Sequence, residues 1–284
     1  MAVSFDNLGH GHLRGFLDKR VRDGVIRRAI DKWLKAGVME DGVLTRAGKG
    51  TPQGGVVSPI LANVYLHEVI DTWYECDVRP RMRGKTFMLR FADDVVMVFA
   101  EERDARRVLE VLPKRLAKFG LTMSPEKTRL VEFRRPTWKA GTKRPNGRSG
   151  PGTFDFLGFT HSWGKSRKGR WTVVRRTSAS RLKRAVKAIW IWCQRNRHWK
   201  VTEQHQQLSA KVRGHCAYYG ITGNSKSLNR FRTQVERAWR FWLNRRSQRA
   251  KMTWRRFKLL KLRYPLPPAR AIHSVYCGAA KPWS

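Results

Sequence analysis

Acidic residues are scarce in this chain, and they are unevenly distributed. The 284 residues include 60 Lys and Arg but only 21 Asp and Glu, which gives a formal net charge of +39 at pH 7. Nineteen of the acids lie at or before Asp155, and only Glu203 and Glu236 follow. A charge this large destabilises a compact fold by self-repulsion unless a polyanion balances it. The composition therefore excludes a protein without a polyanionic partner, and a nucleic acid is the partner we expect.

The sequence also lacks long apolar runs and closely spaced cysteines. No apolar stretch approaches the roughly 18–20 residues that cross a membrane, and the N-terminal residues MAVSFD lack the features of a signal peptide. No two cysteines form a C-x-x-C pair, so neither a zinc finger nor a disulfide framework is expected. We therefore expect a cytoplasmic protein without a membrane partner, whose cysteines are core residues or free thiols. They are Cys76, Cys193, Cys216 and Cys277.

The chain does contain a charge-balanced first half and a basic second half. With 12 Trp and 13 Phe, it holds too many aromatic residues for a disordered basic tail. Segment 177–261 carries 22 Lys and Arg against two acids, an excess that indicates a binding face rather than an ordinary solvated surface. Residues 134–152 are rich in Gly, Pro and basic side chains, and they are predicted to form a loop, most simply a disordered surface excursion.

Hydrophobic spacing predicts two helices near the start of the chain. Apolar residues from Leu17 to Trp33 recur at helical spacing until Gly37, which predicts one helix. The next helix is expected to have Ser58 as its N-cap and Pro59 at its first helical position, because proline has no N–H to satisfy there.

The remaining pattern predicts a hairpin followed mainly by helices. Residues 87–90 and 95–100 are apolar and β-branched or aromatic, and they predict two strands around a tight turn. A helix over residues 103–119 follows, and Pro113 is expected to kink or break it. The second half is predicted to contain four helices. The first begins at Ser178, and the second runs through Leu208–Tyr219 and ends at Gly220. The third begins at Ser225, and the fourth carries Trp254 and Phe257 and ends before Pro265.

Asp93 and Asp94 lie side by side at the tip of the predicted hairpin. Aspartate is common in turns, and on the dipeptide alone turn chemistry is the simpler interpretation. The alternative is a site for a hard cation, because Mg²⁺ binds carboxylate oxygens together with substrate phosphates. Two such ions can stabilise the attacking and leaving oxygens of an in-line displacement.

Three other blocks favour the metal-site interpretation. Residues 50–59 form a glycine-bearing loop before a helix, residues 121–128 place Lys127 after a turn, and residues 156–159 read Phe-Leu-Gly-Phe. Together with Phe91-Ala92-Asp93-Asp94, and in this order, the blocks resemble the palm of a reverse transcriptase. The Asp-Asp block is similar to the aromatic-Ala-Asp-Asp signature of that family.

The resemblance can be narrowed to bacterial group II intron-encoded reverse transcriptases with maturase function, and it covers essentially the whole chain. It is carried by residues 50–65, GTPQGGVVSPILANVY, and by Gly214, Tyr218-Tyr219-Gly220 and Asn229-Arg230-Phe231. No Cys- or His-rich endonuclease block follows, so the chain resembles members that lack this domain. The resemblance implies an α+β fold, in which an antiparallel palm sheet with packed helices precedes an all-helical thumb or maturase domain.

The same resemblance implies domain boundaries and an activity. Residues 1–133 would be partial fingers and palm, 134–152 a basic loop, 153–176 the end of the palm, and 177–284 the thumb and tail. The implied activity is RNA-directed DNA polymerisation by Mg²⁺-dependent nucleotidyl transfer, with a role in intron splicing and mobility. The implied partners are group II intron RNA, an RNA template, a DNA primer and deoxynucleotides.

Residue roles follow from the matched blocks. Asp93 and Asp94 would be the catalytic, metal-binding residues. The nucleotide or primer would contact Gln53, Gly54, Phe91, Ala92, Lys127, Leu157 and Gly158. Intron RNA would contact basic residues of the predicted thumb, namely Lys183, Arg184, Lys187, Lys211, Arg213, Arg230 and Arg240.

One departure from the family pattern leaves the activity open. A third metal-binding Asp is expected six residues before the Asp of a Phe-Asp pair, here Phe5-Asp6. It would fall before Met1, or at Ala2 if a small deletion is allowed, so the chain resembles an N-terminally shortened member without the third carboxylate. Losing one preorganised electrostatic group costs about 10²–10³ in rate. The chain could therefore be a polymerase, a non-catalytic RNA-binding maturase remnant, or a decayed fragment that aggregates.

Overall fold

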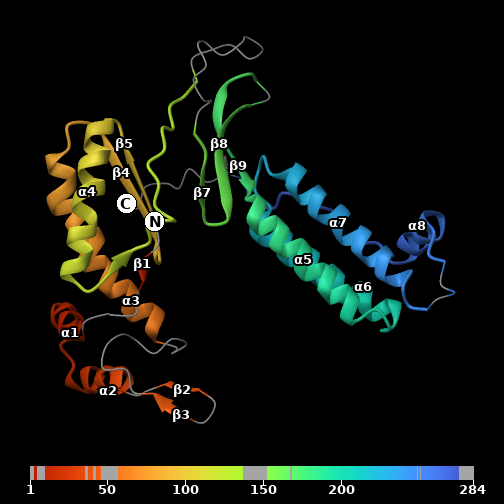
Figure 1. Cartoon of the computed structure of the whole chain (residues 1–284), viewed down its shortest axis with the longest axis horizontal. Coiled ribbons are helices and arrows are strands. Elements are labelled where there is room, and N and C mark those ends of the chain that lie inside the picture. Colours follow the sequence, from red (N-terminus) through yellow and green to blue (C-terminus); the bar gives the residue numbers. More distant parts are fainter. Residues whose placement is uncertain are drawn as a thin grey trace. The chain divides into compact units, whose positions relative to one another are not determined.

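The computed structural model describes the chain in segments, and these form two compact units, Met1–Leu130 and Val131–Ser284. Both units combine helices with antiparallel strands, in agreement with the predicted α+β class (Figure 1). Within the described segments, no helix has the length and apolar character needed to cross a membrane. The described residues are 3–4, 10–35, 38–40, 43–45, 57–136, 152–166, 168–247, 249 and 251–274.

The first unit begins with two helices where the spacing had predicted one. α1 spans His10–Asp18 and α2 spans Gly24–Lys35, so the predicted single helix from Leu17 to Trp33 is wrong. The break is explained by Asp23, whose Oδ1 accepts hydrogen bonds from the backbone N–H groups of Val25 (2.7 Å) and Ile26 (2.9 Å). An aspartate that satisfies the free N–H groups of a helix start favours a new helix at that point.

A long helical segment follows, and its second half is wound as a π-helix. Its N-cap is Val57, one residue before the predicted Ser58, while Pro59 lies in the first turn as expected. Buried Tyr65, Leu66, Val69, Ile70 and Tyr74 hold one side of the segment in the core of the first unit. Its successive parts are α3 (Ser58–Leu66), π-helical η1 (His67–Thr72) and η2 (Tyr74–Val78), and a 3₁₀ turn η3 (Arg79–Arg81).

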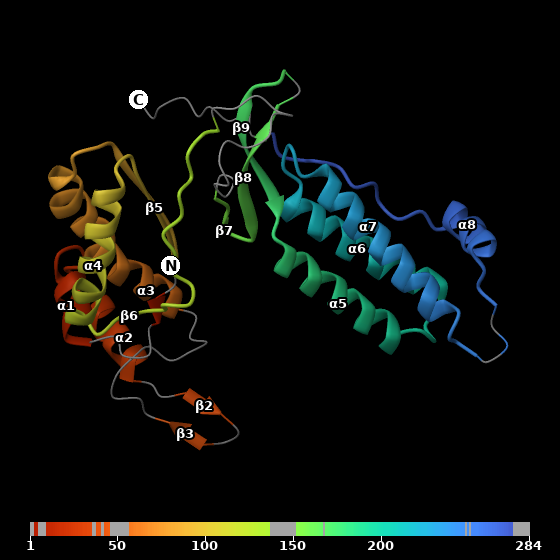
Figure 2. The same ribbon diagram turned by 45° about the horizontal axis from the view of Figure 1, so that its top comes forward.

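The predicted hairpin and the helix after it are present. Strands β4 (Thr86–Phe91) and β5 (Asp94–Phe99) pair antiparallel, and α4 (Glu102–Lys118) packs against β5 (Figures 1 and 2). Of the two predicted effects of Pro113, a kink or a break in α4, the break is absent. The helix runs through Pro113 because buried Val108, Leu112 and Leu116 continue one apolar stripe on both sides of the proline.

Short strand pairs complete the described part of the first unit. β1 (Val3–Ser4) pairs with β6 (Thr122–Met123), and β2 (Val38–Glu40) pairs with β3 (Val43–Thr45), both antiparallel. The β1–β6 pair therefore joins the start of the chain to the segment just before Lys127.

The second unit contains a three-stranded antiparallel sheet in the order β7-β8-β9. β7 (Phe154–Phe156) turns directly into β8 (Phe159–Lys165), and β9 (Trp171–Thr177) returns along the other edge of β8. Residues 137–151, most of the predicted basic loop, lie outside the described residues.

The helices predicted for the second half are confirmed. α5 (Ala179–Arg195), α6 (Val201–Tyr219) and α7 (Ser225–Leu243) run side by side, and α8 (Trp254–Arg263) packs near the end of α7 (Figures 1 and 2). Their shared core is apolar and includes Leu208, Val212, Phe231, Val235 and Trp239.

An ion cluster links α7 to α8. The Glu236 carboxylate on α7 pairs with Lys261 Nζ on α8 at 2.8 Å and with Arg232 Nη2 at 3.3 Å. Only 13% of the Glu236 side chain is exposed, so its charge is balanced locally rather than by water.

Candidate active site

Asp93 and Asp94 lie at the tip of the β4–β5 hairpin, as predicted. Phe91 pairs with Asp94 across the strands, which leaves Ala92 and Asp93 as the two-residue connection. Ala92 has a φ of +51°, in the left-handed region that a residue with a β-carbon rarely adopts. The turn therefore holds two half-buried carboxylates on a strained backbone.

The donor chemistry of this pair fits Mg²⁺. Among the described residues, no side chain forms a hydrogen bond or ion pair with either carboxylate. No group of three or more His, Cys, Asp or Glu side chains gathers within the described segments, and Asp6 lies outside them. Mg²⁺ is commonly held by one or two carboxylates together with substrate phosphates, and the two free carboxylates match this donor set.

The two faces of the hairpin differ sharply in burial. Met88, Val95 and Met97 face the core of the first unit. Phe87, Leu89 and Phe91 point to the other face and are exposed, and Phe91 has a relative accessibility of 64%. The carboxylates thus lie beside an exposed aromatic ring, and such a ring can stack on a nucleic-acid base.

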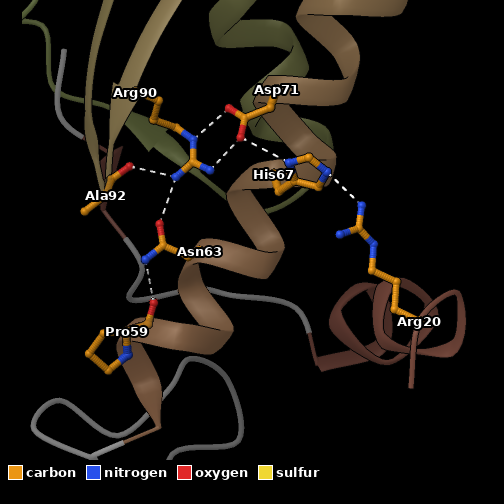
Figure 3. A network of polar contacts seen from close by, with 7 residues as sticks. All are labelled: Arg20, Pro59, Asn63, His67, Asp71, Arg90 and Ala92. Atoms are coloured by element: carbon orange, nitrogen blue, oxygen red, sulfur yellow. Dashed lines mark hydrogen bonds and ion pairs between the residues drawn. The ribbon is translucent and has the colours of Figure 1, made fainter. Parts of the chain in front are cut away.

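Arg90 braces the hairpin from the buried side (Figure 3). Its guanidinium donates to both carboxylate oxygens of Asp71, from Nε at 2.7 Å and from Nη2 at 2.6 Å. Its Nη1 donates to Asn63 Oδ1 at 2.9 Å and to the backbone carbonyl of Ala92 at 3.1 Å. The last contact reaches the residue immediately before Asp93.

The network extends along the helical segment beneath the hairpin (Figure 3). His67 Nε2 lies 2.9 Å from Arg20 Nη2, and His67 Nδ1 lies 3.2 Å from Asp71 Oδ2. Because a guanidinium has donors only, His67 Nε2 accepts from Arg20 and Nδ1 donates to Asp71. Asn63 Nδ2 donates to the Pro59 carbonyl at 3.0 Å. Asp71 is therefore held from two sides.

Sequence reasoning missed this network. The stronger of its two signals is Arg90 itself, a charged residue on the inward-facing side of an apolar strand, where burial requires a partner. The spacing of Asn63, His67 and Asp71 at intervals of four is a further weak signal, because such residues lie on one side of a helix.

Among the predicted nucleotide contacts in the first unit, Lys127 lies on an exposed turn. Thr128 fixes this turn, because its Oγ1 donates to the Ser124 carbonyl at 2.8 Å and its N–H to the Pro125 carbonyl at 3.2 Å. Gln53 and Gly54 lie outside the described residues. Phe91 and Ala92 belong to the hairpin described above.

Leu157 and Gly158 form the turn between β7 and β8 in the second unit. Both have positive φ values, +50° and +77°, as a type I′ hairpin turn requires. The turn is tied to two helices, because the Ser178 N–H donates to the Gly158 carbonyl at 2.9 Å and Tyr218 Oη donates to the Leu157 carbonyl at 3.2 Å. A β-carbon on Gly158 would lie 2.9 Å from Tyr219 Oη, so glycine is required there.

The predicted RNA-binding residues lie on α5, α6 and α7. Arg240 differs from the others, because it is half-buried, its guanidinium lies 4.1 Å from the Trp254 ring centroid, and its Nη1 donates to the Met252 carbonyl. These contacts give Arg240 a packing role between α7 and the segment that carries α8. The exposed residues are Lys183, Arg184 and Lys187 on α5, Lys211 and Arg213 on α6, and Arg230 on α7.

The polar residues of the helical core are structural. The His215 ring stacks on Phe231 with centroids 3.8 Å apart, and desolvation lowers the pKa of His215 to about 4. Burial raises the pKa of the Cys193 thiol to about 12, which makes it a poor nucleophile at neutral pH. Cys193 and Cys216 are buried free thiols and Cys76 is an exposed one, as their spacing predicted, while Cys277 lies outside the described residues.

Comparison with known proteins gives short but specific similarities. The group II intron-encoded protein LtrA of Lactococcus lactis subsp. cremoris is 45% identical over 65 residues, which cover 23% of this chain and 11% of LtrA. Protein YkfC of Escherichia coli K12 is 31% identical over 119 residues, 33% of this chain and 31% of YkfC. A 91 kDa protein in the cob intron of Schizosaccharomyces pombe is 40% identical over 65 residues, 23% of this chain and 8% of that protein. The chain therefore matches a third or less of each relative's length.

The family comparison covers more of the chain. The model of the reverse transcriptase (RNA-dependent DNA polymerase) family matches residues 16–161. This range runs from α1 into β8 and includes the Asp93–Asp94 hairpin with its Arg90 brace. Because the match takes in half of the sequence together with the paired carboxylates, the chain belongs to the reverse transcriptase family.

Proposed function

We propose that the chain is part of a group II intron-encoded reverse transcriptase that polymerises DNA on an RNA template and acts as a maturase toward intron RNA. The similarity to LtrA supports the intron assignment. The observation that carries the polymerase activity is the pair of free carboxylates, Asp93 and Asp94, on a braced hairpin tip. A net charge of +39 suits an RNA partner, and such a protein would act in the cytoplasm beside its RNA.

In the proposed reaction, the 3′-hydroxyl of a DNA primer attacks the α-phosphate of a deoxynucleotide, and pyrophosphate leaves. Asp93 and Asp94 would hold Mg²⁺, which would neutralise charge on the reacting phosphates. Exposed Phe91 would offer its ring to the nucleotide, and the small side chain of Ala92 would leave the turn open. Lys127 would attract a phosphate from its exposed turn.

The other proposed contacts depend on the wider architecture. Gln53 and Gly54 would line the nucleotide pocket, and Leu157 and Gly158 would bear on the primer end. We propose a palm within residues 1–133 and 153–176, and a thumb or maturase domain in 177–284. The sheet β7-β8-β9 nevertheless belongs to the same compact unit as α5–α8. The rigid turn at Leu157 and Gly158 would therefore move with the helices.

The helices α5–α7 would bind the intron RNA. Lys183, Arg184 and Lys187 lie within little more than one turn of α5, and all three are exposed. Clustered exposed cations are suited to a phosphate backbone, because each contact releases condensed counterions. Lys211, Arg213 and Arg230 would extend this contact onto α6 and α7.

The polymerase proposal can be tested by primer extension on an RNA template with Mg²⁺, comparing the chain with Asp93→Asn. We expect Asp93→Asn to lower the extension rate by about 10²-fold or more, because the substitution removes one of two carboxylate ligands. Asp77→Asn is a matched control, since Asp77 is exposed and pairs with Arg81 away from the hairpin tip. Equal rates for the chain and for Asp93→Asn would contradict the proposal.

A second candidate function is RNA binding without catalysis. It is favoured by the exposed cations of α5–α7, which do not depend on the hairpin. This candidate predicts that the chain binds intron RNA with the same affinity before and after Asp93→Asn, and makes no extension product. A decayed, aggregating fragment would instead lack a cooperative melting transition.

A further inference from the structure

We propose that Arg90 is a positioning residue, which fixes the turn that presents Asp93 and Asp94. The role for polymerisation rests on the proposed function above, whereas the effect on the turn does not. The feature that points to Arg90 is the convergence of its guanidinium on the side chain of Asp71, the side chain of Asn63 and the backbone of Ala92 (Figure 3).

The turn needs an external restraint. Ala92 has a φ of +51°, and the left-handed conformation costs about 1–2 kcal/mol for a residue with a β-carbon. A two-residue connection under this strain would relax unless neighbouring groups held it. The hydrogen bond from Arg90 Nη1 to the Ala92 carbonyl, at 3.1 Å, holds the peptide group that leads into Asp93.

Arg90 can act as this restraint because it is itself immobilised. Only 12% of its side chain is exposed, and both oxygens of the Asp71 carboxylate accept from it. A bidentate arginine–carboxylate pair fixes the plane of the guanidinium as well as its distance. Asp71 in turn lies on η1 between buried neighbours Val69 and Ile70 and the core residue Trp73, so the anchor belongs to the core.

The body of the hairpin does not need Arg90. Tyr74 Oη lies 2.7 Å from Thr86 Oγ1 at the opposite end of β4. Met88, Val95 and Met97 bury the middle of the two strands against the core. Arg90 thus provides a polar contact at the tip rather than along the strands, and its loss should affect the turn more than the fold.

The main experiment compares Arg90→Lys with Arg79→Lys in the full chain. Lysine keeps the positive charge but loses the planar fork that binds Asp71 and the Ala92 carbonyl together. Arg79 donates to Glu75 at 2.7 Å on the same helical segment, but this pair is exposed and distant in sequence from the turn, so Arg79→Lys is the matched control. Each variant is measured by amide hydrogen exchange, Mn²⁺ binding and primer extension.

We expect Arg90→Lys to raise the exchange rate of the amides at residues 91–95 about tenfold and to leave the exchange of the other strand residues unchanged. Outer contacts that orient metal ligands typically change affinity or activity by 10–100-fold. We therefore expect about tenfold weaker Asp93-dependent Mn²⁺ binding and a lower maximal extension rate, with a smaller change in the KM for deoxynucleotide. Arg79→Lys should match the unsubstituted chain in all three measurements.

A second variant covers the case in which Arg90→Lys unfolds the first unit. Asn63 is an exposed helical residue, and Asn63→Ala removes one contact of Arg90 while leaving the ion pair with Asp71 in place. In Asn63→Ala, amide exchange should again rise only at residues 91–95, by less than in Arg90→Lys, and the melting temperature should not change.

Two outcomes would overturn the positioning role. One is exchange at residues 91–95 in Arg90→Lys that equals the exchange in Arg79→Lys. The other is a rise spread evenly over the whole first unit in both Arg90→Lys and Asn63→Ala, which would mark a general stabilising role. If the unsubstituted chain makes no extension product, the polymerase proposal fails, and hydrogen exchange still decides the role of Arg90.

Discussion

At the tip of the β4–β5 hairpin, Asp93 and Asp94 offer two carboxylates, and Arg90 holds the turn between them and the strand through the Ala92 carbonyl. Asp93 and Asp94 could be predicted as candidate ligands only together with the blocks at residues 50–59, 121–128 and 156–159, because turn chemistry is the simpler interpretation of the Asp-Asp pair alone. The partner of Arg90 could not be predicted, because Asp71 lies 19 residues away and meets Arg90 only through the winding of η1 beneath β4. The sequence therefore predicts the candidate metal ligands, but it does not predict the contacts of Arg90 that fix their turn.

His215 makes stability depend on pH. Its folded-state pKa of about 4 lies below the ordinary histidine value of 6.5, because desolvation disfavours the charged ring. The folded state therefore binds fewer protons than the unfolded state in this range. The contribution of His215 to stability is present above about pH 6.5, and it is lost as the pH falls toward about 4.

Substituting this ring by phenylalanine should remove that dependence. Between pH 7 and pH 5, we expect the melting temperature of His215→Phe to fall by about 2–4 °C less than that of the unsubstituted chain. This figure allows for the partial exposure of the His215 ring. At pH 7 the variant should be at least as stable, because Nε2 of His215 is buried without a partner among the described residues. Thermal melts at several pH values measure this, with His198→Gln, at an exposed histidine, as the control. Parallel curves for His215→Phe and the unsubstituted chain would contradict the assignment.

At the scale of elements, the helices of the second unit were predictable and several features of the first unit were not. α5 and α7 carry apolar residues at helical spacing along their length, so periodicity locates them, whereas α6 begins at Val201 and its apolar spacing only at Leu208. The division between α1 and α2 depends on one capping aspartate, Asp23, which overrides a stripe that spans both helices. The π-helical winding of η1 and η2 has no signal in the hydrophobic spacing of residues 67–78.

The turn between β7 and β8 allows a paired test of packing around a glycine. Gly158 and Gly169 both have positive φ values, +77° and +72°, so alanine at either position incurs a similar backbone penalty of about 1–2 kcal/mol. Gly158 alone of the two faces a close neighbour, Tyr219 Oη at 2.9 Å from the position of a β-carbon, whereas Gly169 has open space.

Gly158→Ala should therefore destabilise the second unit more than Gly169→Ala does. We expect the free energy of unfolding to fall by about 1 kcal/mol or more beyond the loss in Gly169→Ala, because Tyr219 must shift to accept the added carbon. Denaturant titration of the two variants gives the difference directly. An equal loss of unfolding free energy in both variants would mean that the Tyr219 side chain moves aside at little energetic cost.

Across the whole molecule, charge is the property that the sequence predicts best. The net charge and the position of the basic segment follow from counting, and the described structure adds which side chains are exposed. The division at Leu130 was not visible in the composition, and it differs from the boundary after residue 176 that the resemblance implies between palm and thumb. Compact units are set by tertiary contacts, and the contacts between strands β7, β8 and β9 and the helices behind them could not be read from residue types.

RNA affinity should depend steeply on salt. If the exposed cations of α5–α7 bind phosphates, the Kd should rise about 10²–10³-fold between 50 and 200 mM monovalent salt. Replacing Lys183, Arg184 and Lys187 together by alanine should reduce the slope of log Kd against log salt by about two to three units. Filter binding across a salt series measures both quantities.

The first unit supplies a matched control for this experiment. Arg103, Arg106 and Arg107 form a similar exposed cluster on α4, and replacing them by alanine removes the same charge. We expect this variant to keep the steep slope. Equal reductions from the two triple variants would show that overall charge, rather than the surface of α5, determines binding.

Glu236 reduces the number of cations that the second unit can offer to phosphate. This one acid restrains two cations, Lys261 and Arg232, that would otherwise be available to phosphate, and it fastens the helix that carries Lys261. If the second unit binds RNA as proposed, a mutation that removed the acid would strengthen its attraction to phosphate and would also loosen α8. Under the proposed RNA-binding role, tighter RNA binding and a stable fold therefore place opposite demands on position 236.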